Sequence, residues 1–337
     1  MERVAESANV VSLWLDDPLA SLRPPPRAGQ HLRVHLTDGK GRAVWRCYTV
    51  SGVEASRLRI SVKRDGIMSS LLHADQPLGG HMLISGPFGD VHLRDEVGGA
   101  RPVVLLSAGI GITPTIAMLR ELAASGSDRR VFVGHVARDG SDLALWAEAR
   151  AIVRRLPRAS AQLYLSQTGA GACEAHGAVP GRMPFDAMLQ GLPSVREADA
   201  YVCGPAGFLA DALAALLRAG ASPGRVHAEV FASPKAGATA SGSQQVDRRP
   251  RPAGPFKVRF TSSGVAATWS PQAGTLLDVA EAAGLVPAAN CRSGVCGACR
   301  TPLLGGCVDH DPEPALPVGA NAAYLCCAVP LGDVVLA

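Results

Sequence analysis

A group of cysteines near the C-terminus constrains the fold of this chain more than any other feature. Cys291, Cys296 and Cys299 follow the spacing C-x4-C-x2-C, and the adjacent pair Cys326 and Cys327 lies further along the chain. Three thiolates from one loop and a fourth from a distant segment are the arrangement that holds a [2Fe–2S] cluster. The spacing therefore predicts an iron–sulfur site built on a tightly folded loop.

Gly294 and Gly297 lie within this loop. Glycine adopts positive φ angles without strain, and its bare backbone lets amide N–H groups approach the sulfurs. A zinc site is the alternative interpretation, but zinc sites usually have two C-x2-C pairs and this sequence has one. Cys307 is off the pattern, and either member of the later pair could supply the fourth ligand.

Residues 255–337 resemble a plant-type ferredoxin domain. The similarity includes the run from Cys326 to Asp333, which matches that family's last ligand followed by C-x3-P-x2-D. Cys327 fits only if the loop slips by one residue. The cluster ligands that the resemblance implies are Cys291, Cys296, Cys299 and Cys326.

Composition and charge exclude several classes of function. The chain has 337 residues, of which 47% are hydrophobic, so we expect two or three domains. The net charge is +4 with no long basic block, which argues against nucleic-acid binding. No apolar run reaches the length of a membrane span or a signal peptide, so we expect a cytoplasmic protein without membrane insertion.

Short strands separated by turns dominate residues 1–98 and predict a small antiparallel β-barrel. An Arg46-Cys47-Tyr48-Thr49 strand and a Gly66–Ser69 turn stand out in it. Alternation places Arg46 and Tyr48 on one face, where a guanidinium could hold a phosphate and a ring could pack on a flavin. Alone, the first motif is an ordinary strand, and Ser69 could simply be a helix N-cap. The predicted strands are 10–15, 30–36, 44–50 and 58–63.

Together with the Gly86–Asp90 segment, these motifs resemble the FAD-binding domain of the ferredoxin–NADP reductase superfamily, most closely the reductase half of flavohaemoglobins. Thr49 stands where that family usually has serine, and a single glycine replaces a common pair. The FAD-binding residues that the resemblance implies are His31, Arg46, Tyr48, Thr49, Gly66, Met68 and Ser69.

Strand–helix alternation begins near residue 99 and predicts an α/β domain with a parallel sheet, residues 99–233. Ligands of such sheets bind at the carboxyl ends of the strands, where the sequence has a G-x-G-x-T-P turn at 109–114 and a C-G-P turn at 203–205. A glycine turn can also be a plain helix start, and a cysteine at a strand end is commonly a small buried side chain.

The superfamily resemblance covers residues 9–233 and includes both turns and a final Glu-x-Phe. It implies that the turns flank the nicotinamide and that Glu229 and Phe231 return to the flavin. The implied catalytic residues are Thr113, Cys203, Glu229 and Phe231. The implied nucleotide-binding residues are Gly109, Gly111, Thr113, Pro114, Cys203, Gly204 and Pro205.

The segment after the second strand of this domain favours NADH over NADPH. It contains one basic residue, Arg138, followed by Asp139. A 2′-phosphate usually requires an arginine placed to receive it, and Arg138 keeps NADPH as the alternative.

The remaining chain is predicted to be a flexible linker, 234–254, and a ferredoxin domain of the α+β β-grasp class, 255–337. The linker is rich in Ala, Gly, Ser, Arg and Pro without apolar periodicity. Beyond it we expect strands at 256–261 and 266–270, a helix at 275–283 and then the cluster loop.

These resemblances imply an electron-transfer enzyme with the order NADH, FAD, [2Fe–2S] and a separate one-electron acceptor protein: an oxygenase, a hydroxylase or a cytochrome. No globin precedes Val10, so we expect no haem in this chain. A stand-alone diaphorase that reduces quinones or ferric complexes is one alternative. A redox sensor or a zinc-stabilised binding module is another.

Overall fold

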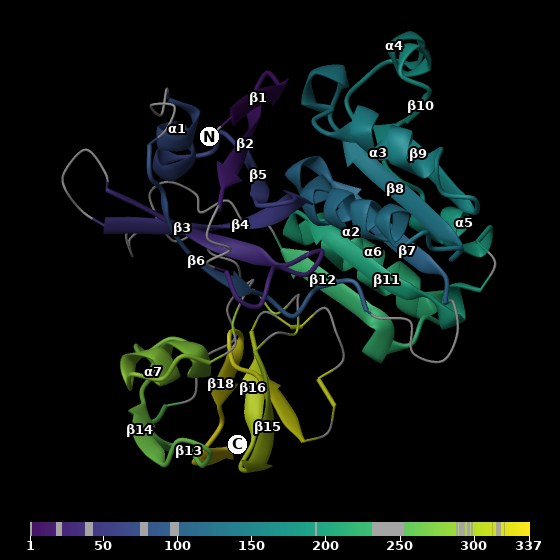
Figure 1. Cartoon of the computed structure of the whole chain (residues 1–337). Helices are drawn as coiled ribbons and strands as arrows, with labels where there is room; N and C mark the ends of the chain where they lie inside the picture. The colour runs from purple at the N-terminus through teal and green to yellow at the C-terminus, as the bar shows by residue number, and fades with distance from the viewer. Residues whose placement is uncertain are drawn as a thin grey trace. The chain divides into compact units, whose positions relative to one another are not determined.

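The computed structural model (Figure 1) describes residues 2–17, 22–37, 43–74, 80–94, 101–192, 194–230, 253–287, 289, 294, 297, 299–311, 313–314, 318–319 and 321–337. The chain divides into two compact units, Met1–His227 and Ala228–Ala337. Most of the predicted linker, together with Phe231, Cys291 and Cys296, lies outside the described residues. The domain boundaries at 98 and 233 remain predictions. Within the described residues, no helix combines the length and the hydrophobicity needed to cross a bilayer.

An antiparallel sheet of order β1-β2-β5-β4-β3-β6, the N-terminal sheet, opens the first unit. Its core contains side chains such as Leu13, Val34 and Ile60, which are almost completely buried. The bounds are β1 Glu2–Ser7, β2 Val10–Asp16, β3 His31–Thr37, β4 Ala43–Glu54, β5 Arg57–Lys63 and β6 Leu83–Phe88, with helix α1 at Ile67–His73.

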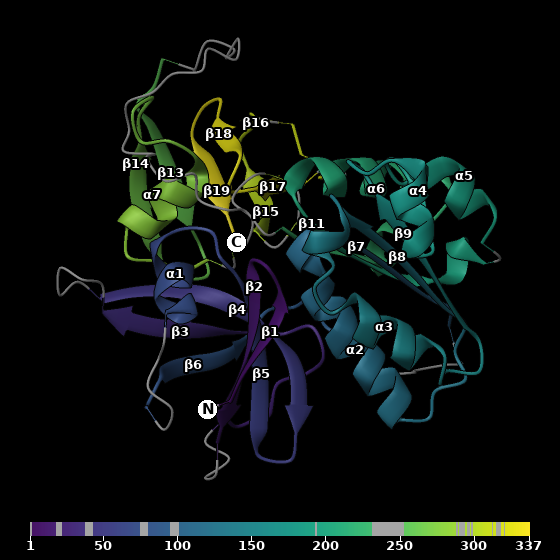
Figure 2. The ribbon, with the colours of Figure 1, turned by 90° about the horizontal axis from the view of Figure 1, so that it is seen from above.

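The second sheet of this unit has the order β10-β9-β8-β7-β11-β12 and is called the parallel sheet. Every residue of β7 is buried, as expected for a strand covered on both faces. Figure 2 shows α2 and α3 on one face and α5 and α6 on the other. The strands are β7 Val103–Ala108, β8 Val131–Ala137, β9 Ala159–Leu165, β10 Ala178–Pro180, β11 Asp199–Gly204 and β12 Val226–Val230. The helices are α2 Ile112–Ala124, α3 Trp146–Val153, α4 Ala170–Ala175, α5 Phe185–Gln190 and α6 Ala206–Arg218.

One predicted helix of the parallel-sheet region starts later than expected. The sequence pattern predicts a helix over 142–156, but α3 covers only Trp146–Val153. A 3₁₀ turn occupies Gly140–Asp142, and Leu145 has a φ of 61°, which lies in the left-handed region and cannot continue an α-helix.

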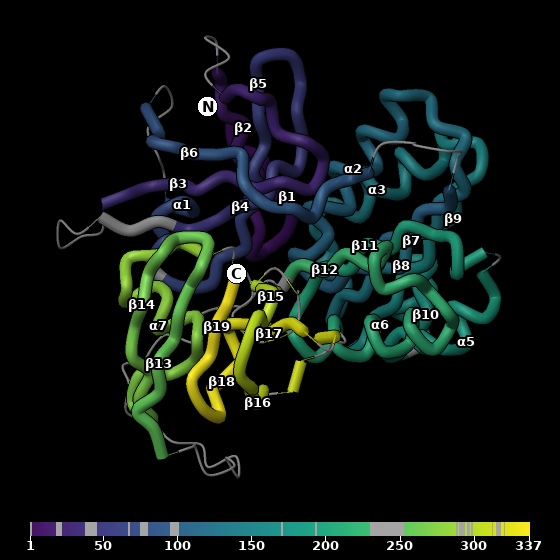
Figure 3. Tube along the Cα trace, turned by 90° about the horizontal axis from the view of Figure 1, so that it is seen from below, coloured from purple at the N-terminus to yellow at the C-terminus, as the bar shows by residue number. Residues whose placement is uncertain are grey.

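The second unit contains a mixed sheet of order β14-β13-β19-β15-β17, in which β13 and β14 form a hairpin and β13 runs parallel to β19. Helix α7, beside β14 in Figure 3, begins after a capping box in which Thr275 and Asp278 bond each other's backbone N–H groups. The bounds are β13 Phe256–Phe260, β14 Val265–Trp269, α7 Leu276–Ala282, β15 Arg300–Gly305, β16 Val308–His310, β17 Ala322–Tyr324, β18 Ala328–Pro330 and β19 Val334–Leu336.

Candidate functional site

Two predicted turns lie side by side at the carboxyl edge of the parallel sheet. Strand β7 pairs with β8 on one side and with β11 on the other, and Ser107 at its end is opposite Cys203. The strand order therefore reverses at β7, with β8 on one side and β11 on the other. Open parallel sheets bind their ligands at such a topological switch point. The helices that follow, α2 and α6, both start without a side-chain N-cap. In α2 the N–H of Ile112 already donates to the carbonyl of Gly109, whereas the first N–H groups of α6 are available to an anion.

Gly111 shows how closely the two turns approach each other. A Cβ atom added to it would lie 2.2 Å from the carbonyl oxygen of Cys203 and 2.9 Å from the backbone nitrogen of Gly204. No side chain fits in that space, so the meeting of the turns requires glycine. The sequence predicted each turn separately, and the structure brings them together.

Gly109 differs from Gly111 because the space beside it is open. It has a φ of 53°, and an added Cβ would meet nothing within 4 Å. Thr113, buried in the first turn of α2, donates its hydroxyl to the carbonyl of Ile110 at 3.0 Å and so stabilises the turn. Pro114, at the third helical position, removes an N–H that has no intrahelical partner. The edge therefore combines a rigid turn with an open glycine face that a phosphate could approach.

Cys203 and Glu229, two further predicted catalytic residues, are also buried. Cys203 is 4% exposed at the end of β11, next to Gly204 and to Pro205, which precedes α6. Glu229 is 4% exposed on β12, at the edge of the parallel sheet. Their contacts with a nicotinamide or a flavin remain predictions.

A buried polar cluster at the same edge was missed by the sequence analysis. His135 on β8 is fully buried, and its Nδ1 lies 2.8 Å from the hydroxyl of Ser107. The imidazole stacks on Trp146 with a centroid distance of 5.5 Å. Burial lowers the pKa of His135 from 6.5 to about 4, although Ser107 partly opposes the shift. A lone histidine in an apolar strand carries no motif, so only the fold could reveal this cluster.

The buried His135 predicts a loss of stability in mild acid. Its pKa is lower in the folded chain than the ordinary value of 6.5, so between pH 6.5 and 4 only the unfolded chain binds the proton. His227 has a similarly lowered pKa of about 4, mainly through burial and then through Arg94. We expect the unfolding free energy to fall as the pH is lowered through this window, with a slope that is smaller by about one proton in His135→Asn. Urea unfolding at several pH values measures both slopes, and equal slopes would contradict the assignment.

Arg138, the one basic residue after β8, is already paired. Its guanidinium forms an ion pair with Asp142, whose other carboxylate oxygen accepts a hydrogen bond from the amide of Asn9 at 3.0 Å. Asp139 accepts from the backbone N–H of Ser141 at 2.8 Å. The carboxylates of Asp139 and Asp142 therefore lie next to Arg138 in the sequence or in an ion pair with it. A 2′-phosphate bound here would require a free positive charge.

Three of the predicted flavin-binding residues lie on β4 of the N-terminal sheet. Arg46 is exposed, Tyr48 is half-buried and Thr49 is buried. Burial raises the pKa of the Tyr48 phenol to about 12, although the charge of Arg46 opposes the shift, so the ring is neutral at physiological pH. The Thr49 hydroxyl is buried without a hydrogen-bond partner among the described residues. Such an atom is costly unless a ligand completes its bonding, which fits a bound cofactor.

His31 lies directly opposite Thr49 and pairs with Phe88 at the end of β6. The two rings are 6.3 Å apart, and an added Cβ at Gly89 would lie 3.0 Å from the Nδ1 of His31. Arg33, which the sequence analysis did not single out, places its guanidinium 4.4 Å from the centre of the Phe88 ring. The strand register thus joins the predicted flavin strand to the Gly86–Asp90 segment.

The serine of the predicted Gly66–Ser69 turn makes its hydrogen bonds within the turn itself. The Ser69 hydroxyl donates to the carbonyl of Gly66 and accepts from the N–H of Asp65 at 2.7 Å. Met68 is 5% exposed in the core of the N-terminal sheet, so a cofactor contact by this residue would have to come from its backbone. Gly66 has a φ of 107° and open space beside it. The turn retains room for a ligand, but the hydroxyl of its serine is already hydrogen-bonded within the turn.

In the second unit, amide groups point at cysteine sulfurs. The N–H of Gly294 donates to the Sγ of Cys326 at 3.2 Å, and the N–H of Cys326 donates to the Sγ of Cys299 at 3.4 Å. Gly294 and Gly297 both have a φ of 72°, which confirms the predicted left-handed backbone. Amide donors to sulfur are what an anionic iron–sulfur cluster requires, so these residues fit the predicted group.

Cys327 is fully buried beside the same loop, where an added Cβ at Gly294 would lie 3.0 Å from its sulfur. Its thiol lies 3.5 Å from the carbonyl of Tyr324. Cys307 is exposed. No three potential metal ligands converge within the part of the chain that the structure describes, which lacks two of the four predicted ligands.

Comparisons with known proteins agree with this division of the chain. The family described as an oxidoreductase NAD-binding domain matches residues 105–213, and the 2Fe-2S iron-sulfur cluster binding domain matches residues 260–331. A flavohemoprotein of Deinococcus radiodurans is 36% identical over 220 residues, which cover 64% of this chain and 53% of that protein. The chain thus spans about half the length of this relative.

A second relative covers both units. The heme-dependent oxidative N-demethylase beta subunit of Ectopseudomonas mendocina is 31% identical over 316 residues, 91% of this chain and 87% of that protein. The chain belongs to the ferredoxin–NADP reductase-like family. It is a member with an NAD-binding oxidoreductase domain and a C-terminal 2Fe-2S domain. Among solved structures, the FAD/NAD-binding domain of a Vibrio cholerae nitric oxide dioxygenase matches this family member with 26% identity and a TM-score of 0.61 over 68% of this chain and 95% of that one.

Proposed function

We propose that the chain is an NADH-dependent FAD and [2Fe–2S] reductase that delivers single electrons to a separate acceptor protein. One chain combines two glycine turns at the carboxyl edge of the parallel sheet, here called the nucleotide edge, with cysteine sulfurs that accept hydrogen bonds from backbone N–H groups. This combination is the observation that carries the proposal. When bound, FAD would accept a hydride from NADH and pass its electrons one at a time to the cluster. The chain's own residues bind and orient these groups.

The nucleotide residues have distinct roles in this proposal. Gly109 leaves the turn open for a pyrophosphate, and the uncapped N-terminus of α6 supplies N–H donors. Gly111 lets the Cys203 segment close against the turn, and Thr113 stabilises that geometry. The ion pair that occupies Arg138 supports NADH as the substrate, because a 2′-phosphate would meet carboxylates without a free arginine.

For FAD, we infer a site along β4 and the end of β6, in a sheet that closes as a barrel. The buried Thr49 hydroxyl supports it, because a flavin or its ribityl chain could complete the bonding of this atom. Arg46 is exposed and could bind a phosphate, and the neutral Tyr48 ring could pack on the isoalloxazine.

For the cluster, we propose Cys291, Cys296, Cys299 and Cys326 as ligands in a β-grasp domain. The hydrogen bonds from Gly294 to Cys326 and from Cys326 to Cys299 support this choice over Cys327. The parallel pairing of β13 with β19, with α7 between them in the chain, is consistent with that domain type.

The acceptor is proposed to be a haem-containing or other oxygenase on a separate chain. The relative that matches this chain over most of its length is named as the beta subunit of a heme-dependent oxidative N-demethylase. A reductase subunit that supplies a haem subunit would need the same order of groups as proposed here.

An anaerobic visible spectrum before and after stoichiometric NADH tests the proposed function. We expect flavin and iron–sulfur bands in the purified protein and bleaching of both on addition of NADH. A flavin that bleaches beside an absent or unresponsive cluster would instead indicate a plain flavin reductase. Zinc without flavin or iron would indicate a binding module.

A further inference from the structure

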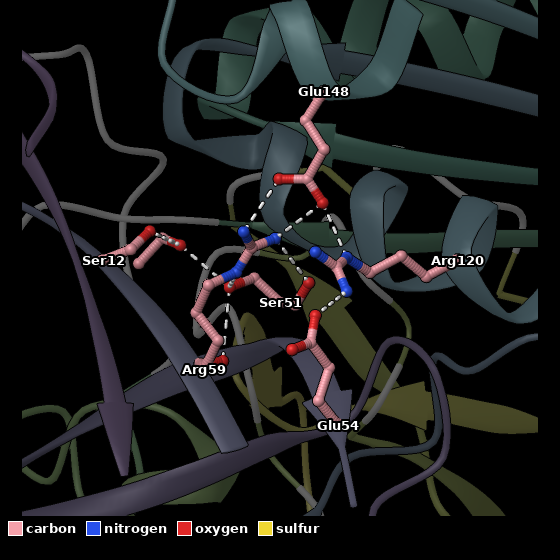
Figure 4. Close-up of polar contacts among 7 residues, drawn as sticks. Ser12, Ser51, Glu54, Arg59, Arg120 and Glu148 are labelled. Carbon is pink, nitrogen blue, oxygen red and sulfur yellow. Dashed lines mark hydrogen bonds and ion pairs between the residues drawn. The ribbon is translucent and has the colours of Figure 1, made fainter. Parts of the chain in front are cut away.

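A buried ion-pair network joins the N-terminal sheet to the helices of the parallel sheet (Figure 4). Glu148, in the first turn of α3, lies at its centre. One carboxylate oxygen accepts from Arg59 Nη1 at 2.8 Å, and the other accepts from Arg59 Nη2 at 3.1 Å and from Arg120 Nε at 2.6 Å. Arg120 on α2 also donates to Glu54 at 2.8 Å. The network therefore connects β4, β5, α2 and α3.

Arg59 also holds β4 immediately beyond the predicted flavin residues. Its Nε donates to the Ser51 hydroxyl at 3.1 Å, and its Nη2 donates to the Ser51 carbonyl at 3.0 Å. The register of β4 against β5 shifts between Val50 and Gly52. The Arg59 guanidinium therefore binds Ser51 at this irregularity, two residues after Thr49. Serine hydroxyls of β2 and β5 extend the bonding inward, since Ser61 lies 2.8 Å from both Ser12 and Ser51.

The network has a buried inner part and a solvated outer part. The Arg59 side chain is 5% exposed and that of Glu148 is 24% exposed, whereas the Glu54 side chain is 52% exposed. A cleft of about 470 Å³ between β4, α2 and α3 borders the outer part. Burial opposes ionisation of Glu148, but the hydrogen bonds and charges of Arg59 and Arg120 outweigh it and lower its pKa. Glu148 is therefore a carboxylate at neutral pH.

Two of the four elements that the network joins, β4 and α2, also carry or adjoin residues of the proposed cofactor sites. Strand β4 carries the predicted flavin residues at 46–49, and α2 begins at the nucleotide turn. Arg120 lies on the same helix, about 12 Å along the axis from Ile112 at a rise of 1.5 Å per residue. A change of tilt at Arg120 would therefore move the nucleotide turn relative to β4.

We propose that Glu148 is a positioning residue for hydride transfer, which it controls by fixing α2 and α3 against the flavin strand through Arg59 and Arg120. This inference rests on the proposed function. Glu148 has no contact with a reacting atom in the proposal. It acts through the orientation of the two elements that carry the cofactors.

Stopped-flow reduction of the FAD-loaded protein by NADH tests the role of Glu148. In Glu148→Gln we expect the limiting rate of flavin reduction to fall roughly tenfold to hundredfold, because a misplacement of about 1 Å has an effect of that size. The apparent Kd for NADH should stay within about threefold of the wild-type value, since the binding turn is intact. Amide hydrogen exchange should become faster at residues 50–54 and in α3, which requires no turnover.

Two further variants keep the test decisive. Arg120→Gln leaves the Arg59–Glu148 pair in place, so it should fold even if Glu148→Gln does not, and should slow flavin reduction by about threefold to tenfold. Asp186→Asn is the matched control, because it breaks an exposed ion pair with Arg218 between α5 and α6 of the same unit. It should leave flavin reduction and exchange at residues 50–54 unchanged.

Wild-type rates and exchange in Glu148→Gln, or in Arg120→Gln if the former does not fold, would overturn the inference. Failure of NADH to reduce the wild-type flavin would instead contradict the proposed function. In that case the exchange comparison alone still decides whether the network fixes β4 against the helices.

Discussion

Cys326→Ser is expected to remove the iron–sulfur bands and to abolish electron delivery to a one-electron protein acceptor, whereas its neighbour Cys327→Ser is expected to retain both. The reason is the direction of the amide groups: Gly294 donates to the Cys326 sulfur, while the Cys327 thiol lies against a carbonyl. The substitution would leave the Gly294 N–H without its sulfur acceptor and the cluster without its fourth thiolate ligand. Iron content should fall below about one tenth of the wild-type value, and cytochrome c reduction should fall with it.

Reduction of ferricyanide by NADH is the internal control for this pair, because the flavin alone can reduce ferricyanide. We expect both variants to keep this activity. Loss of ferricyanide reduction in Cys326→Ser would contradict the proposed order of the groups. Loss of the cluster in Cys327→Ser but not in Cys326→Ser would reassign the fourth ligand.

Gly111→Ala is expected to weaken NADH binding strongly. The added methyl group would lie 2.2 Å from the carbonyl oxygen of Cys203, which is backbone and cannot rotate away. One of the two turns must therefore move. Overpacking of this kind costs roughly 1–3 kcal/mol, which corresponds to a binding loss of about fivefold to 150-fold if the nucleotide site bears all of it. Titration of the purified protein with NADH measures the change.

Gly224→Ala is the matched control for Gly111→Ala. It lies in the turn before β12, at the opposite edge of the parallel sheet, and an added Cβ there meets nothing within 4 Å. The FAD content of both variants should equal that of the wild type, since neither position lies on the N-terminal sheet. Normal NADH affinity in Gly111→Ala would mean that the two turns do not form the nucleotide site.

The sequence predicted the elements whose patterns are local. Continuous apolar runs identified β7, β8 and β11, and the glycine turns lie at the ends of β7 and β11 as predicted. Residues such as Gly294 could be interpreted because a tight cluster loop requires a positive φ, and that φ is observed. These features depend on neighbours within a few positions, so a single sequence contains them.

Other features depend on partners that the sequence cannot reveal. Arg59 and Glu148 are 89 residues apart, and each alone reads as an ordinary surface charge. Strand β1 consists mostly of exposed side chains and pairs only with β2, so it has no apolar alternation to predict it. Leucine favours helices, and the left-handed backbone of Leu145 that delays α3 therefore gives no local signal.

The pairing of β7 with β11 also has a consequence for how the chain is made. Cys203 follows its partner Ser107 by 96 residues, and these strand ends carry the turns of the proposed nucleotide site. At a synthesis rate of about 5–20 residues per second, the ribosome needs roughly 5–20 s to supply β11 after β7. During that interval β7, which is wholly buried in the finished fold, has an open edge on one side. NADH bound at the proposed site could not assist folding until β11 arrives, so the nascent chain would depend on β8 and the covering helices to protect β7.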